Sequence, residues 1–194
     1  MSQLKLTADG GGGTVSLKGP ASTTGNAAIE LTVPGTASGT LAVGDTGKIL
    51  QVVQATTTDV ASFSTSSSWV DGGLSATMTP SAASSKILVS YRILLGQSAG
   101  NMRATRLAKS VAGASYSAIT NVNVYAYAGN TQSTSHIHPV DLEFLDTPSY
   151  SLGQTVAYRV EVNSYNTTLY RNQYGAGTGM GAMISTMTLM EVAA

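Results

Sequence analysis

The sequence contains no cysteine, and only 10% of its 194 residues carry a formal charge. Without cysteine, disulfides and thiolate metal sites are excluded, and the composition gives no indication of a redox compartment. Ten basic and ten acidic residues leave a formal net charge of zero. A neutral chain has no long-range field that attracts nucleic acid or anionic lipid, so we expect neither as a partner.

Long apolar runs are also missing. No stretch is long enough to cross a bilayer, and the opening residues MSQLKLTADGGGG lack the apolar core of a signal peptide. We therefore expect no membrane insertion and no standard secretion. Release of the protein by cell lysis fits this pattern.

The sequence does contain regular short segments in which apolar residues alternate with small polar ones. Alternation at period two is typical of strands. The segments span residues 49–54, 74–78, 86–95, 102–108, 118–127, 156–162 and 184–192. Gly, Ser and Asn clusters separate them, and no convincing amphipathic helix lies between them. This pattern predicts an all-β antiparallel sandwich or jelly roll.

Two of these segments carry specific expectations. Residues 86–95 (KILVSYRILL) form the longest apolar run, which predicts a central strand buried on both faces. In residues 156–162, Val156, Tyr158, Val160 and Val162 should share one face in the core. Residues 102–111 (MRATRLAKSV) have fair helix propensity, so a helix is the alternative to a strand there.

The first 47 residues differ from the rest. Short apolar pieces such as residues 4–6 and 15–17 stand between Gly- and Pro-containing breakers, and each is too short to bury a face alone. We interpret residues 1–47 as an extended Gly-rich N-terminal arm that anchors the chain. Residues 48–194 then form the β-sandwich module.

Two motifs suggest chemistry. Residues 96–100 (GQSAG) match the turn that exposes a nucleophilic serine, here Ser98. However, no Asp or Glu occurs between Ser98 and His136, so the chain order of that hydrolase site is absent and a hairpin loop is favoured. His136 and His138 would project from one face of a strand, with Asp141 and Glu143 close behind. Threefold symmetry would bring six such nitrogens to one axis, enough for an octahedral metal, whereas a polar loop ended by Pro139 is the simpler interpretation. We predict no catalytic residue, no cofactor and no metal.

Four tyrosines and one arginine late in the chain are the candidates for contact with a host surface or a neighbouring subunit. They are Tyr150, Tyr165, Tyr170, Arg171 and Tyr174, which stand close to several Asn and Gln residues. Aromatic faces beside amide and guanidinium donors bind saccharide or protein surfaces. Equally, such tyrosines can alternate between the core and a subunit interface.

The opening, with TVSLKGPASTTGNAAIELTVPG after its glycines, resembles the N-termini of structural proteins of tailed bacteriophages, especially those of marine and cyanobacterial hosts. The later blocks GKILQVVQATTTD, LSATMTPSAASSKILVSYRI, DLEFLDTPSYSLGQTVAYRVEV and ISTMTLMEVAA are similar to the β-rich terminal module of their fibre-like proteins. RATRLAKS stands where that module has a strand, which favours the strand over the helix. HIHP is not part of the pattern.

This resemblance implies a homotrimeric jelly-roll sandwich built into the virion. The expected function is that of a non-enzymatic tail-fibre or adhesin-type subunit, assembled in the host cytoplasm. Its arm would dock on other virion proteins of the capsid or tail, and its module would face a host cell-surface glycan or protein. The alternative is a capsid decoration protein, of cement or head-fibre type, that stabilises the shell. A small esterase that uses Ser98 is the third class.

Overall fold

The computed structural model describes residues 3–7, 14–18, 47–65, 68–97, 102–127, 137–164, 167–173 and 183–194. The chain divides into two compact units, Met1–Ala42 and Val43–Ala194. This division lies close to residue 47, where the composition changes. Each unit is described by itself.

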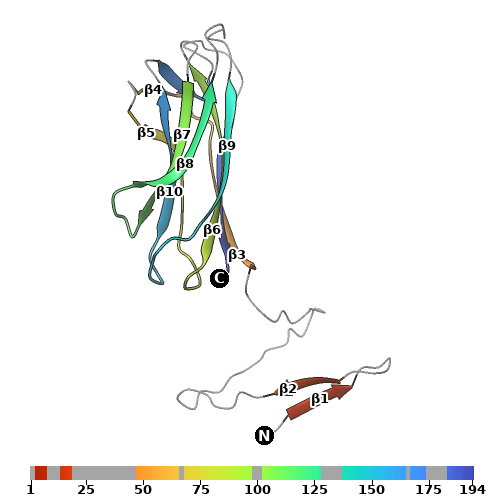
Figure 1. Cartoon of the computed structure of the whole chain (residues 1–194). Coiled ribbons are helices and arrows are strands. Elements are labelled where there is room, and N and C mark those ends of the chain that lie inside the picture. Colours follow the sequence, from red (N-terminus) through yellow and green to blue (C-terminus); the bar gives the residue numbers. More distant parts are fainter. Residues whose placement is uncertain are drawn as a thin grey trace. The chain divides into compact units, whose positions relative to one another are not determined.

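The first unit contains a two-stranded antiparallel hairpin. Strand β1 (Gln3–Thr7) pairs with β2 (Thr14–Lys18), and the ladder aligns Leu4 with Leu17 and Leu6 with Val15 (Figure 1). The two apolar pieces therefore find each other as partners. The glycine-rich breakers between them predicted an extended arm but gave no sign of this pairing.

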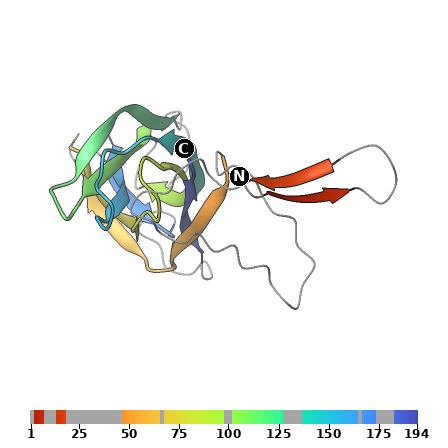
Figure 2. The ribbon, with the colours of Figure 1, turned by 90° about the horizontal axis from the view of Figure 1, so that it is seen from below.

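The second unit consists of two antiparallel sheets, which we call sheet I and sheet II. Sheet I has the order β5–β10–β7–β8, with β5 (Val70–Met78), β10 (Val156–Ser164), β7 (Met102–Val111) and β8 (Ser117–Tyr127). Sheet II contains β3 (Ile49–Thr57), β4 (Ala61–Ser64), β6 (Lys86–Gln97), β9 (His138–Asp146), β11 (Thr168–Arg171) and β12 (Ser185–Val192). Figure 2, a view from below, shows the strands of this unit arranged around a common interior.

Sheet II contains two interrupted strands. β11 and β12 both pair with β6, β11 at residues 95–97 and β12 at residues 86–92, while β4 pairs with β11 and β3 with β12. Each couple therefore acts as one strand, and the order of sheet II becomes β3/β4, β12/β11, β6, β9. Two four-stranded sheets connected in this way form an eight-stranded jelly roll. The all-β jelly-roll prediction is confirmed.

Two residues bridge the break between β11 and β12. The Asn172 main-chain N donates to the Leu94 carbonyl (3.0 Å), and the Leu94 N donates to Ser185 Oγ (3.1 Å). Ser185 Oγ in turn donates to Asn172 Oδ1 (2.7 Å), and Asn172 Nδ2 donates to the Thr57 carbonyl (2.9 Å). Asn172 has a φ of +55°, a conformation that Asn adopts more readily than most residues. These bonds keep the ladder of sheet II continuous where the chain leaves it.

The core lies between the two sheets and follows the predicted alternation. Val156, Tyr158, Val160 and Val162 are all fully buried, as expected. Leu74, Ala76 and Met78 of β5 alternate with exposed residues in the same way. Because successive side chains of a strand point to opposite faces, this period of two gives each sheet one buried face.

The structure decides two further expectations. β7 covers residues 102–111, so the strand is confirmed and the helix alternative is wrong. The expectation that residues 86–95 are buried on both faces is also wrong. β6 is central in sheet II, but Arg92 is exposed and Ser90 only half-buried, because a sandwich leaves the outer face of each sheet to solvent. The described residues contain no helix that could span a membrane.

The sandwich has two distinct ends. At the end we call the base, the Gly47 N donates to the Ala193 carbonyl (3.0 Å) and the Ala193 N donates to the Lys48 carbonyl (2.8 Å). The chain therefore joins the module and finishes at the same end. At the opposite end, the tip, β6 ends at Gln97, β7 begins at Met102 and β9 begins at His138.

Candidate functional site

The contact residues predicted from the sequence do not form one cluster. Tyr150 lies at the base, where its hydroxyl donates to the Ala82 carbonyl (2.7 Å). Tyr170 lies near the tip, paired with Ser62 and Gly96, at the other end of β6. Tyr165 and Tyr174 lie outside the described residues. Closeness in sequence therefore does not bring Tyr150 and Tyr170 together.

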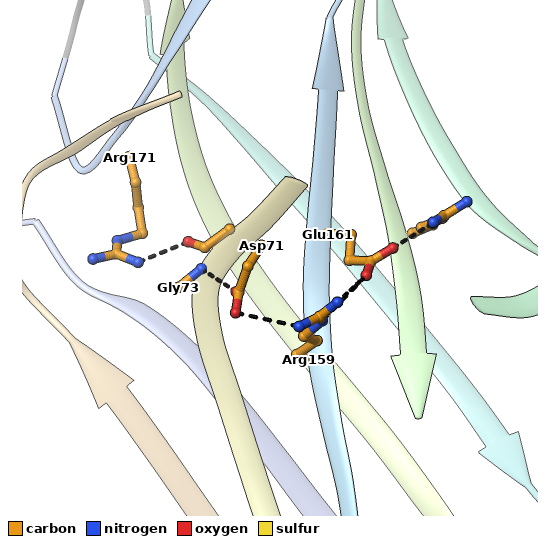
Figure 3. A network of polar contacts seen from close by, with 7 residues as sticks. Asp71, Gly73, Arg159, Glu161 and Arg171 are labelled. Atoms are coloured by element: carbon orange, nitrogen blue, oxygen red, sulfur yellow. Dashed lines mark hydrogen bonds and ion pairs between the residues drawn. The ribbon is translucent and has the colours of Figure 1, made fainter. Parts of the chain in front are cut away.

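Arg171 of β11 is buried, with 6% of its surface exposed. Its Nη1 donates to the Gly72 carbonyl of β5 in sheet I (2.7 Å) (Figure 3). Its Nε donates to the Asp59 carbonyl in the β3–β4 loop (3.2 Å). Burial lowers the pKa of this guanidinium. Arg171 therefore connects the two sheets, and little of its surface is left for contact with a host.

A bulge in β5 makes room for this arginine. Between Val160 and Glu161 of β10 the register with β5 shifts, so that Gly72 and Gly73 have no one-to-one partners. Gly73 has a φ of +67°, and a Cβ there would collide with Arg171 Nη1. Glycine is required at this position by both conformation and space.

A polar network crosses the outer face of sheet I. Arg106 Nε donates to Glu161 Oε2 (2.6 Å), and Arg159 donates to Glu161 Oε1 through Nε (3.1 Å) (Figure 3). Asp71 lies 3.6 Å from Arg159 and accepts a bond from the Gly73 N (2.7 Å). Burial raises the pKa of Glu161, but the bonds from Arg159 and Arg106 outweigh it and hold that pKa below its usual value.

Aromatic rings stack on the two arginines of this network. The Arg106 guanidinium lies 4.6 Å from the ring centre of Trp69, and that of Arg159 lies 4.3 Å from the ring centre of Tyr116. Such cation–π contacts stabilise partly buried arginines. The network closes the middle of the outer face of sheet I with contacts inside the chain. No sequence pattern predicts it, because its members come from four separate segments.

A second buried carboxylate organises the base. Glu191 of β12 is fully buried and accepts main-chain bonds from Ser81 (2.9 Å) and Ala82 (3.0 Å) in the β5–β6 loop. Gln51 Nε2 also donates to it (2.6 Å). Burial raises the pKa of Glu191, but the bonds from Ser81, Gln51 and Ala82 lower it to about 2.

The remaining buried ionisable groups of the base form a third cluster. Asp146 Oδ2 accepts bonds from Tyr158 Oη (2.6 Å) and Lys109 Nζ (2.7 Å). Burial and the bond to Asp146 raise the pKa of Tyr158 far above its ordinary value. This cluster joins β7, β9 and β10, so its hydrogen bonds hold these three strands together.

The inner face of the tip carries polar side chains. Arg103 of β7 is 1% exposed, and among the described residues its Nε and Nη1 have no hydrogen-bond acceptor. Burial lowers the pKa of this guanidinium. Thr65 and Ser164 lie at the same end and bond to each other through their hydroxyls (2.7 Å).

The described residues of the predicted metal and nucleophile motifs do not come together as a site. His138 pairs with Leu95, which places it on the inner side of β9, whereas Asp141 and Glu143 stand on the outer side. His136 and Ser98 lie outside the described residues. The described residues contain no group of three or more potential metal ligands. After the GQSAG motif the next described element is strand β7, whereas the nucleophile turn leads into a helix.

The outer face of sheet II differs from that of sheet I. It contains an open hollow of about 580 Å³ whose lining includes Ser90, Arg92, Asp141, Glu143, Thr186 and Thr188. Arg92 Nε donates to Asp141 Oδ1 (2.7 Å), and both side chains are at least half exposed. The short Ser and Thr side chains leave the centre of this face uncovered.

Comparison with known proteins adds no assignment, since the chain matches no protein-family model and no curated protein.

Proposed function

We propose that this chain is a non-enzymatic structural subunit of a phage virion, a homotrimeric protein of the tail-fibre or adhesin type. In this proposal residues 1–47 dock on the particle and the jelly roll presents its tip to the host surface. The observation that carries the proposal is the difference between the two ends of the module. The chain joins the sandwich and finishes at the base, bonded through Gly47 and Ala193, which leaves the tip at the end away from the arm's attachment.

The use of charge supports a structural role. Glu161, Glu191 and Asp146 are buried and bonded to groups of their own chain, and Arg171 binds main-chain carbonyls of β5 and of the β3–β4 loop. Each of these groups holds a strand, a bulge or a loop in place. A charge that is consumed by such bonds stabilises the scaffold and is not poised to act on a substrate.

Contact with the host would depend on avidity. Three equivalent tips on one trimer, and several trimers on one particle, multiply modest affinities without any chemical step. Tyr170 remains a contact candidate near the tip, whereas Tyr150 at the base bonds to the β5–β6 loop. The ligand in this proposal is a cell-surface glycan or protein.

One observation favours the alternative, a capsid decoration protein. The first unit contains a paired hairpin with two strand edges. A hairpin can add to a sheet of a neighbouring subunit and so lie across a capsid surface. In that case the module would stabilise the shell and the tip would not need a receptor.

Deletion of residues 1–47 tests the docking role of the arm. We expect the shortened chain to fold and to remain trimeric, because residues 48–194 contain the whole described core of the jelly roll. It should no longer join particles when supplied to a phage that lacks the full-length chain. Particle incorporation of the shortened chain would contradict arm docking, and loss of the trimer would show that the arm is the assembly element.

A further inference from the structure

The outer face of sheet II carries an apolar row that crosses all four of its strands. The ladder aligns Val52 of β3 with Met190 of β12, Met190 with Leu88 of β6, and Leu88 with Leu145 of β9. Val52 is 56% exposed and Leu145 is 45% exposed. On the solvated face of an antiparallel sheet, polar residues are the norm. A row of four large apolar residues therefore indicates a covered surface.

Polar rows lie beside the apolar one. Gln54, Thr188, Ser90 and Glu143 form the next row, and Thr56, Thr186, Arg92 and Asp141 the one after it. The side chains at the middle of these rows are short, and those of Ser90, Thr186 and Thr188 line the hollow over the centre of the sheet. Short side chains at these central positions allow another sheet to approach closely.

The opposite outer face is closed in its middle by its own side chains. On sheet I, Trp69 and Tyr116 stack on Arg106 and Arg159, and those arginines bind Glu161. Ala104 and Ala108, which alternation places on that outer face, are 1% and 0% exposed. Tyr125, which pairs with Ala104, is 59% exposed there, but it is a single aromatic residue and does not continue into an apolar row across the sheet.

We propose that a second copy of this chain packs on the outer face of sheet II. The face carries Arg92, Lys86, Asp141 and Glu143, two charges of each sign, so two copies can meet without net repulsion. Four strands of about eight residues present roughly 500 Å² per copy. In a trimer, three such faces turned toward the threefold axis bury roughly 1,500 Å² in all, which is within the size range of a specific interface. The inference rests on the self-association in the proposed function and assigns it to one face.

Single cysteines test this assignment directly, because the natural chain has none. Thr188→Cys places a thiol at the centre of the sheet II face, and Thr77→Cys places one on the outer face of sheet I. Under mild oxidation of the full-length protein, we expect covalent dimers with Thr188→Cys and monomers with Thr77→Cys. Cross-linking of the Thr77→Cys variant alone, or of neither variant, would overturn the proposal.

Charge insertion gives the second readout. Leu145→Lys should weaken self-association at least about tenfold, measured by light scattering across a concentration series. Leu152→Lys is the matched control, since Leu152 is 62% exposed in the β9–β10 loop, away from this face, and it should leave association unchanged. A circular dichroism melt checks that both variants fold. Equal association of the two variants would contradict the assignment.

These outcomes are distinguishable from failure of the proposed function. Cross-linking through position 188 in a protein that is absent from virions supports the inference and refutes the virion role. A virion protein whose copies cross-link only through position 77 leaves the virion role intact and overturns the assignment to sheet II.

Discussion

Individual buried charges decide how this small-residue scaffold is held together. Glu191 and Arg171 each bind several groups that are distant in sequence, and Glu161 binds both its neighbour Arg159 and the distant Arg106. A chain with 10% charged residues places some of them where their hydrogen bonds fix loops and strand ends. These residues are therefore the sensitive positions of the fold.

Glu191 makes the free energy of unfolding depend on pH in the acidic range. Its pKa is about 2 in the folded chain against an ordinary value of 4.5. An acid whose folded pKa is depressed stabilises the fold above its ordinary pKa, and that stability is lost as the pH falls toward about 2. The difference corresponds to on the order of 3 kcal/mol. Urea unfolding between pH 7 and pH 2.5 should show this loss in the natural chain.

The variant Glu191→Gln should be less stable at pH 7 and should lose less free energy of unfolding between pH 5 and pH 2.5. Glu143→Gln, which changes an exposed carboxylate, is the control and should follow the natural chain. Parallel pH profiles of Glu191→Gln and the natural chain would show that this carboxylate does not hold the β5–β6 loop.

For Arg103 we expect that substitution increases the free energy of unfolding. A buried charge without a partner costs free energy, and an apolar side chain of similar volume removes that cost. Arg103→Met should therefore raise the free energy of unfolding, by about 1 kcal/mol or more. Arg106→Met, which removes a bond to Glu161, should lower it by about 1–2 kcal/mol. Urea unfolding measures both, and destabilisation by Arg103→Met would show that the guanidinium has an anionic partner in the folded protein.

At the scale of elements, the β5 bulge couples the two sheets. Gly73→Ala should be strongly destabilising, because it strains a positive φ and displaces the Arg171 guanidinium. Gly153→Ala is the matched control, since Gly153 also has a positive φ (+86°) but a Cβ there meets nothing within 4 Å. We expect Gly73→Ala to cost at least about 2 kcal/mol more than Gly153→Ala in denaturant unfolding. Equal costs would mean that Arg171 adapts freely.

The elements differ in how much of them the sequence predicts. The alternation in residues 156–162 places those side chains correctly, because one face of β10 is buried and local periodicity is then sufficient. β9 also alternates, with Val140, Leu142 and Phe144 on one face. Pro139 suggested a loop there, yet it fits a strand at the edge of sheet II that begins at His138.

Other features depend on contacts that no local pattern records. The bridge between β11 and β12 needs Leu94, Asn172 and Ser185 together, and the sheet I network needs rings from Trp69 and Tyr116. Partners so far apart in sequence are brought together only by the finished topology. For the same reason Tyr150 and Tyr170, the two described tyrosines of the predicted contact set, lie at the base and near the tip.

At the scale of the whole molecule, the jelly roll has a base, a tip and two unlike outer faces. The first and last described residues of the module, Gly47 and Ala194, lie at the base, the middle of the outer face of sheet I is closed by the Arg106 and Arg159 network, and the outer face of sheet II is open. This division of surfaces suits the proposed subunit, which attaches to the particle, associates with its own copies and presents its tip to the host. We propose that this subunit is part of a virion.

The proposed virion role is tested most directly by the copy number of the chain in purified phage particles, measured by quantitative mass spectrometry against the major capsid protein. We expect a few to a few dozen copies per particle, in multiples of three, as roughly expected for a trimeric tail protein. Copies on the order of hundreds would instead place the chain on the shell lattice as a decoration protein. Absence of the chain from the particles would contradict the proposed virion role.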